Sequence, residues 1–401
     1  MSKTYKTLKG MRKFILSMFV AAAASFSVSA TTPNKIVIPN IEGYKTLKGD
    51  FHIHTVFSDA TVWPTTRVQE AIWEGLDVIA ITDHVDSRLQ KQINAGLFNA
   101  GKCDRDRSYE IARKAAGKKL LVIHGGEISR GMPPGHWNCL FVSDCDKICE
   151  EAEKFNDDEF KAAHAGLKEA KAQGGFTMWN HPNWEKQAPN ETKWWKEHTQ
   201  LYNEGYMNGI EVYNKFAGYC PEAHQWALEK NITMFGNSDA HTPFFYMIDY
   251  LNGQYRPITL VFATEKTEEA VRDALEHQRT AVYAEEMVYG REDMLRPLFN
   301  ACVKVSKGKF NPKDMTFTLT NKSCIPIRLL KAPGSENFYY VRNYELRPFE
   351  TITVKVRPLI KNHQYQDLKD KHIDVNFYVD TFQIGPDKPL PVTLHFDAPE
   401  K

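Results

Sequence analysis

The sequence predicts an α/β fold, a barrel of about seven strands, followed by a small antiparallel β-sandwich. Two observations support this prediction. From about residue 50 to 290, short β-rich runs alternate with amphipathic helical stretches, which implies a parallel sheet. After about residue 297 the runs alternate apolar and polar residues without helical periodicity, as antiparallel strands do. A length of 401 residues agrees with two domains.

Seven segments of the first region are expected to be strands: Asp50–Thr55, Asp77–Thr82, Leu120–Glu127, Trp137–Val142, Phe176–Asn180, Gly209–Tyr213 and Thr233–Ser238. Amphipathic patterns between them predict helices at Thr65–Gly75, Ser108–Lys118, Asp158–Gln173 and Pro221–Lys230. A doubly wound sheet is the alternative to a barrel. About seven strands over this length favour the barrel.

The second region contains six alternating segments, separated by Gly, Pro, Asn or Asp: ACVKVSK, MTFTLTN, IPIRLLK, ETITVKVRP, DVNFYVD and LPVTLHF. They predict a β-sandwich of about 100 residues. Its role is open between a stabilising appendage and a binding domain. Because no low-complexity linker precedes it, we expect it to pack against the first region.

The first 30 residues have the pattern of an export signal. Arg12 and Lys13 precede the apolar run Phe14–Phe26, and Val28–Ala30 resembles a cleavage site. We therefore expect a signal peptide at 1–30, a barrel domain at 31–296, a sandwich at 297–401, and a periplasmic or extracellular location. An uncleaved anchor is the alternative, although a run of about 13 residues is short for a membrane span. No other segment is apolar enough to cross a membrane.

The charge argues against one class of function, and the spacing of the cysteines excludes another. The net charge of +1 falls to −4 without the five basic residues of 1–30, and a mildly acidic chain is poorly suited to stable nucleic-acid binding. A small phosphate ester remains compatible with this charge. The seven cysteines include no C-x-x-C pair, which excludes a cysteine zinc ribbon. Disulfides and buried free thiols both stay open, and the oligomeric state is not predicted.

Histidines and acids gather where the predicted strands end. His52 and His54 lie two apart in the first strand, so both face the same side. The set continues with Asp59, His84, Glu127, His136, His181, Asp239 and His241, nearly all at strand carboxyl ends. In parallel α/β barrels these ends meet at one face. We therefore expect all nine side chains to lie together, whereas His124 is out of phase with Glu127 and is expected to be structural.

A site of nine such side chains needs compensation, because carboxylates repel one another and desolvated imidazoles need partners. Bound cations remove both problems. Nitrogen and oxygen ligands without a thiolate suit two to three divalent ions of zinc, manganese or iron. Glu127 is the best candidate to bridge two ions, since a carboxylate has two oxygens. A lone H-x-H pair or a lone post-strand Asp has ordinary structural explanations, so the prediction depends on the ordered set.

The motifs HIHTVFSDAT, ITDH, GGE, GHWN, NHP and NSDAH resemble the PHP (polymerase and histidinol phosphatase) superfamily, in order and over roughly residues 45–290. The resemblance implies a distorted seven-stranded (β/α) barrel with a di- or trinuclear metal site that hydrolyses phosphoesters. Ala60 stands where the family motif has glycine. The export signal and the carboxy-terminal β-domain also resemble a group of exported PHP phosphodiesterases.

The resemblance further implies which residues share an ion. One metal would be held by His52, His54, Glu127 and Asp239; a second by Asp59, His84 and His241; and a third by Glu127, His136 and His181.

The expected reaction is attack on phosphorus by a hydroxide that the metal cluster activates. Glu127 and Asp239 are the expected catalytic ligands. Arg88 and Arg130 are candidates to clamp the phosphate, with Lys215 a weaker one. Each of these cations has an exposed surface role as its alternative.

Three alternatives stay open at this point. The aromatic residues Trp184, Trp194 and Trp195 form either a wall of the substrate cleft or ordinary packing. The enzyme prefers either phosphodiesters or phosphomonoesters. Finally, the protein is either an enzyme or a noncatalytic exported binder of metal or glycan.

Overall fold

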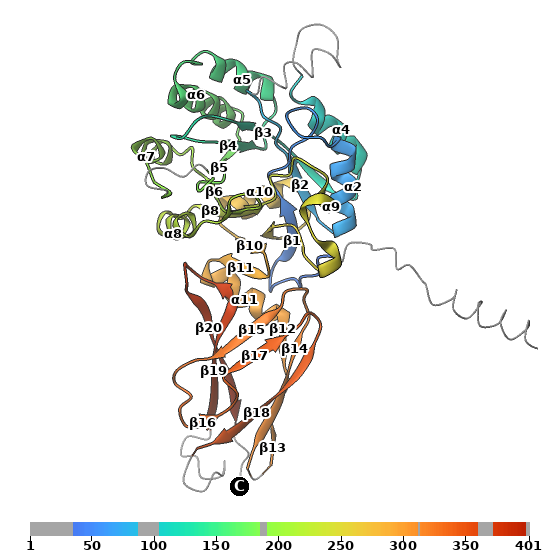
Figure 1. Ribbon diagram of the computed structural model, residues 1–401, viewed down its shortest axis with the longest axis vertical. Helices are drawn as coiled ribbons and strands as arrows, with labels where there is room; N and C mark the ends of the chain where they lie inside the picture. Colours follow the sequence, from blue (N-terminus) through green and yellow to red (C-terminus); the bar gives the residue numbers. More distant parts are fainter. Residues whose placement is uncertain (1–34, 87–103, 185–190, 312, 360–371, 398–401) are drawn as a thin grey trace, which may run out of the picture. The chain divides into compact units, whose positions relative to one another are not determined.

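The computed structural model describes residues 35–86, 104–184, 191–311, 313–359 and 372–397 (Figure 1). The predicted export signal and Arg88 lie outside these residues. Within them, the chain forms a mixed α/β fold with a large central sheet. No described helix combines the length and the apolar composition that a membrane span requires.

The expected alternation of strands and helices is present in the first region. Its strands are β1 (Lys45–Asp50), β2 (Val78–Ile81), β3 (Leu121–Ile128), β4 (Trp137–Leu140), β5 (Phe176–Trp179), β6 (Gly209–Asn214), β7 (Gly218–Tyr219), β8 (Thr233–Asn237), β9 (Ile258–Ala263), β10 (Thr280–Ala284) and β11 (Met287–Gly290). Its helices are α2 (Pro64–Glu74), α4 (Arg107–Ala116), α5 (Cys145–Glu153), α6 (Glu159–Ala172), α7 (Lys196–Asn203), α8 (Pro221–Lys230), α9 (Phe244–Met247), η1 (Tyr250–Asn252), α10 (Glu268–Glu276) and α11 (Glu292–Cys302).

Local sequence explains where the helices begin and end. Helix α2 begins at Pro64, whose fixed φ suits the first helical position, and ends at Gly75 with a left-handed φ of 80°. Asp144 and Asp158 precede α5 and α6, and each side chain accepts a hydrogen bond from a backbone N–H of the first turn. The helices therefore start at capping residues and leave the strand ends free for function.

The predicted closed barrel does not form among the described residues. The sheet runs in the order β11-β10-β9-β1-β2-β3-β4-β5-β6, and β8 forms a ladder only with β6. The reason is that β9 pairs antiparallel with β1, so β1 has no free edge for β8. One isolated bridge, Ile53 to Ala240, joins the segments that follow β1 and β8. The ladder is thus open between β1 and β8, and the predicted distorted seven-stranded barrel is not confirmed.

Strand directions differ from the all-parallel expectation at two places. Strand β4 runs antiparallel to both β3 and β5, and β9 runs antiparallel to β1. Strand β1 also ends at Asp50, so His52 and His54 follow the strand and do not lie in it as expected. The antiparallel direction of β4 matters for function, because it brings the start of β4 to the edge where β3 and β5 carry their functional ends.

The carboxy-terminal segments form strands as expected, but they do not make a separate sandwich. Their strands are β12 (Val303–Val305), β13 (Lys309–Phe310), β14 (Met315–Asn321), β15 (Ile327–Lys331), β16 (Phe338–Tyr339), β17 (Asn343–Leu346), β18 (Thr351–Pro358), β19 (His372–Gln383) and β20 (Pro389–Asp397). A five-stranded sheet contains β12, β13, β14, β16 and β18. The other strands continue the large sheet, because β19 pairs in parallel with β11 through Val288–Phe382 and Tyr289–Gln383.

The two regions share one hydrophobic core. One cluster of buried apolar side chains includes members of both regions, from Ile36 near the start to Phe396 near the end. Helix α11 also runs across the predicted boundary between residues 296 and 297, so that boundary stays a prediction. The six described cysteines are all buried and unpaired.

Candidate metal centre

The segments that follow β1 and β8 lie side by side and carry four of the predicted ligands. Asp239 N–H donates to the His52 carbonyl at 2.8 Å, and His54 N–H donates to the Ala240 carbonyl at 3.2 Å. The fully buried guanidinium of Arg67 donates to the carbonyls of His54 (2.9 Å) and Ala240 (2.7 Å). This backbone network fixes both segments at the same edge of the sheet.

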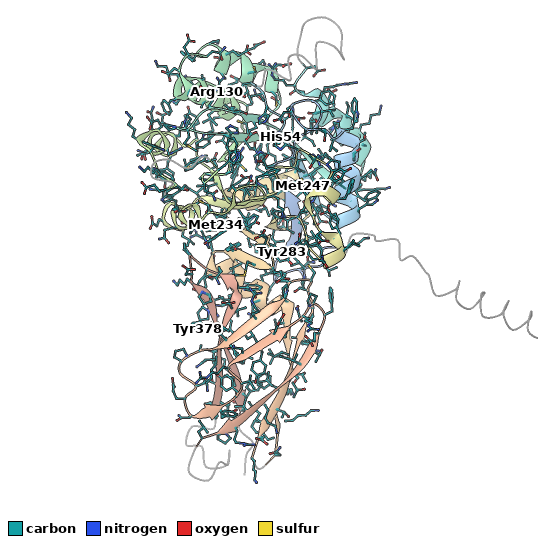
Figure 2. All side chains as sticks on the ribbon, in the orientation of Figure 1. His54, Arg130, Met234, Met247, Tyr283 and Tyr378 are labelled. Carbon is teal, nitrogen blue, oxygen red and sulfur yellow. The ribbon has the colours of Figure 1, made fainter. Side chains whose placement is uncertain are left out.

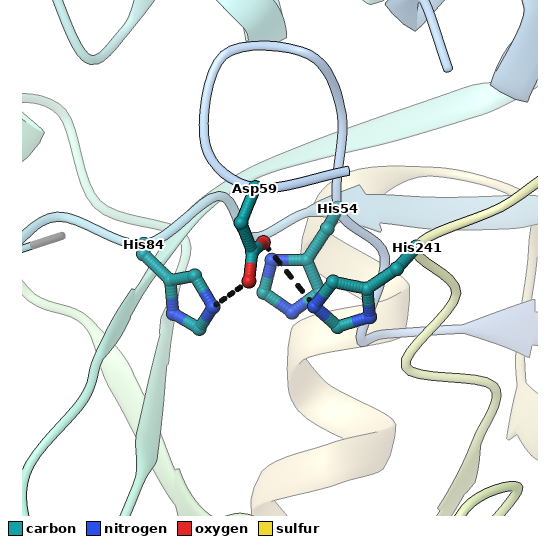
Figure 3. A group of neighbouring side chains, drawn as sticks. All are labelled: His54, Asp59, His84 and His241. Carbon is teal, nitrogen blue, oxygen red and sulfur yellow. Dashed lines mark ion pairs between the residues drawn. The ribbon is translucent and has the colours of Figure 1, made fainter. Parts of the chain in front are cut away.

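The structure brings all nine predicted residues together. Their ligand atoms form overlapping groups, within each of which the atoms lie no more than 4.8 Å apart: His54, Asp59, His84 and His241; His52, His181 and Asp239; His52, His54 and Glu127; and Glu127, His136 and His181. Figure 3 shows the first group, in which Asp59 faces His84 at 3.4 Å and His241 at 3.2 Å. His136 joins the site from the start of the antiparallel β4.

Glu127 lies at the centre of this arrangement and is 1% exposed. Its carboxylate oxygens lie 2.8 Å from His84 Nδ1, 3.2 Å from His136 Nδ1 and 3.4 Å from the Nε2 atoms of His52 and His54. Asn180 Nδ2 donates to Oε1 at 2.7 Å. The second oxygen, Oε2, has no hydrogen bond of good geometry within the described residues. This oxygen lies 2.8 Å from His84 Nδ1, so a positive charge beside it, on a protonated imidazole or a bound metal ion, would stabilise it.

Electrostatics in the site favour opposite charges on neighbouring groups. Burial alone would raise the pKa of Glu127, but the imidazoles of His52, His84 and His136 lower it well below its ordinary value. Burial likewise opposes protonation of His52, yet the carboxylates of Asp239, Glu127 and Glu211 raise its pKa well above the ordinary value. The carboxylates are therefore ionised and attract positive charge, which protons on the imidazoles or bound cations can supply.

The donor set fits divalent transition metals. It consists of six imidazoles and three carboxylates, and it contains no thiolate. His52 Nε2 and His54 Nε2 lie only 3.0 Å apart, with Asp239 Oδ1 at 3.2 Å and 3.1 Å from them. Several donors thus point at a common space, as ligands of one ion do. Which residue belongs to which ion stays a prediction.

Sequence reasoning missed Glu211, which supports the ligands from behind. Its carboxylate is 1% exposed and lies in the middle of β6. Oε1 lies 2.9 Å from His52 Nδ1, and Oε2 accepts from the backbone N–H of His181 at 2.8 Å. The signal in the sequence was an acid inside the apolar run GIEVY. A buried strand tolerates a carboxylate only where hydrogen-bond donors or cations pair with it.

The two described residues that were predicted to bind phosphate, Arg130 and Lys215, differ in their surroundings. Arg130 is 10% exposed at its side chain, pairs through Nε with Asp86 at 2.9 Å, and has no hydrogen-bond partner for Nη2 within the described residues. Lys215 directly follows β6 and forms no ion pair in the part of the chain that the structure describes. Arg130 is thus a fixed guanidinium with free donor capacity.

Of the three predicted tryptophans, one reaches the site. The half-exposed Trp184 ring lies 5.5 Å from the His136 ring and 5.2 Å from the His181 ring. Trp194 packs on Trp179 and Trp226 instead, and Trp195 directly precedes α7. A further aromatic ring, Phe216, lies 5.9 Å from the His241 ring and is also exposed. Two exposed aromatic walls, Trp184 and Phe216, therefore lie beside different histidines of the ligand set.

His124 lies outside the central set, in agreement with its sequence phase. Its Nε2 is 2.9 Å from Asp106 Oδ1 and 3.7 Å from Cys145 Sγ, and its ring stacks on Tyr109 with centroids 4.1 Å apart. Asp106 also accepts a hydrogen bond from the Cys145 backbone N–H at 2.9 Å. These contacts satisfy one another and explain His124 as a structural residue.

The chain is similar to a two-domain protein from Bacteroides vulgatus that contains a predicted PHP-like metal-dependent phosphoesterase. The two chains are 42% identical with a TM-score of 0.80, and the match covers 90% of this chain and 98% of that one. More distant is a protein from Bifidobacterium adolescentis described as a metal-dependent phosphoesterase, with 18% identity, a TM-score of 0.35 and coverage of 49% and 89%. No protein-family model and no curated protein matches the chain.

Proposed function

This chain belongs to the PHP superfamily of metal-dependent phosphoesterases, and we propose that it is an exported phosphodiesterase that acts on a small phosphate ester. The observation that supports a catalytic site most directly is the convergence of nine nitrogen and oxygen ligands around the buried Glu127. The set is complete, as an active phosphoesterase requires.

We propose that the site holds two to three divalent ions of zinc, manganese or iron. When bound, such ions lower the pKa of water toward about 7 and polarise phosphate oxygens. The chain's own residues hold the ligands in place. The His52 Nδ1–H donates to Glu211, which leaves the Nε2 lone pair directed at Glu127 and Asp239. Arg130, fixed by Asp86, is the proposed phosphate contact, and a similar role for Arg88 stays a prediction.

A diester is favoured over a monoester by the two aromatic walls. A phosphodiester carries an organic group on both sides of phosphorus, whereas a monoester carries only one. Trp184 offers an exposed ring beside His181, and Phe216 offers one beside His241. Turnover of bis(4-nitrophenyl) phosphate and of 4-nitrophenyl phosphate, each with added Mn²⁺, tests this preference. A faster monoester reaction would reverse it, and no turnover of either would favour the noncatalytic alternative.

Replacement of Glu127 by Gln tests the site itself. The substitution keeps the size of the side chain but removes its charge and one good ligand oxygen. We expect the loss of at least one metal per chain by elemental mass spectrometry and a fall in kcat of roughly 10³-fold, about 4 kcal/mol of transition-state stabilisation.

The matched control for Glu127→Gln is His164→Ala. His164 lies on α6, outside the ligand set, and faces Glu204 at the surface. It should change neither metal content nor turnover. Normal metal content and turnover in Glu127→Gln would contradict the proposed site.

Export is tested separately by mass spectrometry of the native protein. Cleavage after Ala30 gives a chain that begins at Thr31. An intact amino terminus would favour an anchor.

A further inference from the structure

A large cavity lies where the first region meets the carboxy-terminal strands. Its volume is about 910 Å³, which is in the range of small-molecule sites. Tyr283, near the end of β10, lines this cavity. Figure 2 shows the place of Tyr283 between the first region and the carboxy-terminal strands. The other wall segments are Lys35–Val37, Asn252–Arg256, Ala284–Glu286, Cys324–Pro326 and Glu345–Phe349, together with Lys215. The carboxy-terminal strands thus complete a site that the first region does not form alone.

Three of the nine described non-glycine residues with a left-handed φ line this cavity. Glu285 and Glu286 form the two-residue turn between β10 and β11 with φ angles of 47° and 67°, and Phe349 has a φ of 61°. Glycine or asparagine is the usual residue for such a turn. A left-handed conformation costs a non-glycine residue on the order of 1–3 kcal/mol and is typical of functional sites. Here the strained conformations bring two carboxylates and one aromatic ring to the same cavity.

The charges that line the cavity are balanced and mostly unpaired. Besides the buried Arg256, which pairs with Glu74 and Asp50, three cations and three anions line the wall: Lys35, Lys215, Arg347, Glu285, Glu286 and Glu345. Within the described residues, Glu286 approaches Arg328 at 3.6 Å, whereas Lys35, Lys215, Arg347 and Glu345 form no ion pair. A balanced wall does not favour an anion or a cation as ligand. It offers many hydrogen-bond donors and acceptors to a neutral, polar one.

Three aromatic rings also line the cavity. Tyr283 is buried, Tyr255 is half-buried, and Phe349 is 58% exposed at the rim. Flat rings next to polar side chains suit a ligand that has both apolar C–H faces and hydroxyl groups. We propose that the cavity binds a neutral oligosaccharide, with Phe349 as the stacking ring and the unpaired charges of Arg347 and Glu345 as partners of its hydroxyl groups.

The cavity is connected to the metal centre through three consecutive residues. Asn214 Nδ2 lies 3.3 Å from Asp239 Oδ2, Lys215 lines the cavity, and the Phe216 ring contacts the His241 ring. A sugar bound in the cavity would therefore lie near Phe216, beside the metal centre. If the proposed function holds, on which this step rests, the matching substrate class is a phosphodiester that carries a glycosyl group. Sugar binding itself does not depend on hydrolysis.

The test measures binding without turnover. The full mature chain, stripped of metal with a chelator, is applied to an array of defined neutral, sulfated and phosphorylated oligosaccharides. We expect retention of neutral oligosaccharides, and the affinity for the best-retained one, measured by calorimetry, to fall at least tenfold in Phe349→Ala and in Arg347→Ala. The control is Tyr339→Ala, which removes a ring of 60% exposure from β16, away from the cavity. Thermal melting checks that all variants are folded.

Each outcome decides the proposal. Retention of neutral sugars that only the cavity variants weaken supports it. Three results would overturn it. The array could retain only sulfated or phosphorylated oligosaccharides, or the wild-type protein could retain neutral ones no better than Phe349→Ala does. The affinity could also fall as much in Tyr339→Ala as in the cavity variants. Because the metal is absent, a failed proposed function would appear only in the chromogenic diester assay and leaves this result unaffected.

Discussion

Replacement of Glu211 by Gln should weaken metal binding although Glu211 is not a ligand itself. The Glu211 carboxylate receives four hydrogen bonds: from His52 Nδ1 (2.9 Å), Asn237 Nδ2 (2.9 Å), the His181 backbone (2.8 Å) and Asn214 Nδ2 (3.0 Å). A glutamine replaces one carboxylate oxygen by an NH₂ group. At least one of the four donors would then face an N–H group instead of an acceptor oxygen. His52 can then avoid the clash by carrying its proton on Nε2, which removes the lone pair that faces the metal.

The size of the effect follows from the role of such supporting carboxylates. Loss of one typically lowers metal affinity 10- to 100-fold, which equals about 1.4–2.7 kcal/mol. Glu211→Ala would instead leave several buried donors unsatisfied at about 1–3 kcal/mol each and threaten folding, so Gln is the better perturbation. The matched control is Glu204→Gln, a carboxylate that also faces a histidine, His164, but at the surface.

The assay is competition for Zn²⁺ and Mn²⁺ between metal-free protein and a chromophoric chelator. We expect weaker binding in Glu211→Gln and no change in Glu204→Gln. Equal affinities of Glu211→Gln and wild type, with normal melting temperatures, would refute the reasoning.

Two further predictions concern a phosphate contact and acid stability. Arg130→Ala should raise the KM for bis(4-nitrophenyl) phosphate about 10- to 100-fold, because it removes a charge-assisted hydrogen bond to the phosphate. The control, Arg296→Ala, removes an exposed arginine and should leave the KM unchanged. An unchanged KM in Arg130→Ala would exclude the contact. Burial lowers the pKa of His198 to about 4. As the pH falls, the unfolded chain is therefore protonated at this histidine before the folded protein is, and the free energy of unfolding should decrease between about pH 6.5 and pH 4. In urea titrations of metal-free protein, this decrease should be about 3 kcal/mol smaller in His198→Gln than in wild type, and an equal decrease in both would contradict the prediction.

The grouping of the nine candidate residues could be predicted from sequence because each of them follows or precedes a β-rich run. Strand ends meet at one edge whatever the exact register, so errors of several residues did no harm. Strand β1 shows this, since it covers Lys45–Asp50 and not Asp50–Thr55, yet His52 and His54 still reach the site. The alternation in HIHT has the period of a strand, but its backbone leaves the ladder to meet Ala240.

Other features have no local signal. The run WNCL looks the same for a parallel and an antiparallel strand, so the direction of β4 was not predictable. The absence of a β1–β8 ladder among the described residues depends on which strand covers β1, and β9, more than 200 residues later in the chain, takes that edge. Glu211 was missed because a single buried acid gains its meaning only from partners that the fold brings to it.

The parallel pairing of β11 with β19 has a consequence for folding. Val288 and Phe382 are neighbours across this ladder but lie 94 residues apart in the sequence. Until residue 382 has left the ribosome, the edge of β11 has unpaired backbone groups and can pair with other chains. The chain therefore cannot complete its sheet one region at a time. A nascent or truncated chain that ends before β19 should need protection from aggregation that the full-length protein does not.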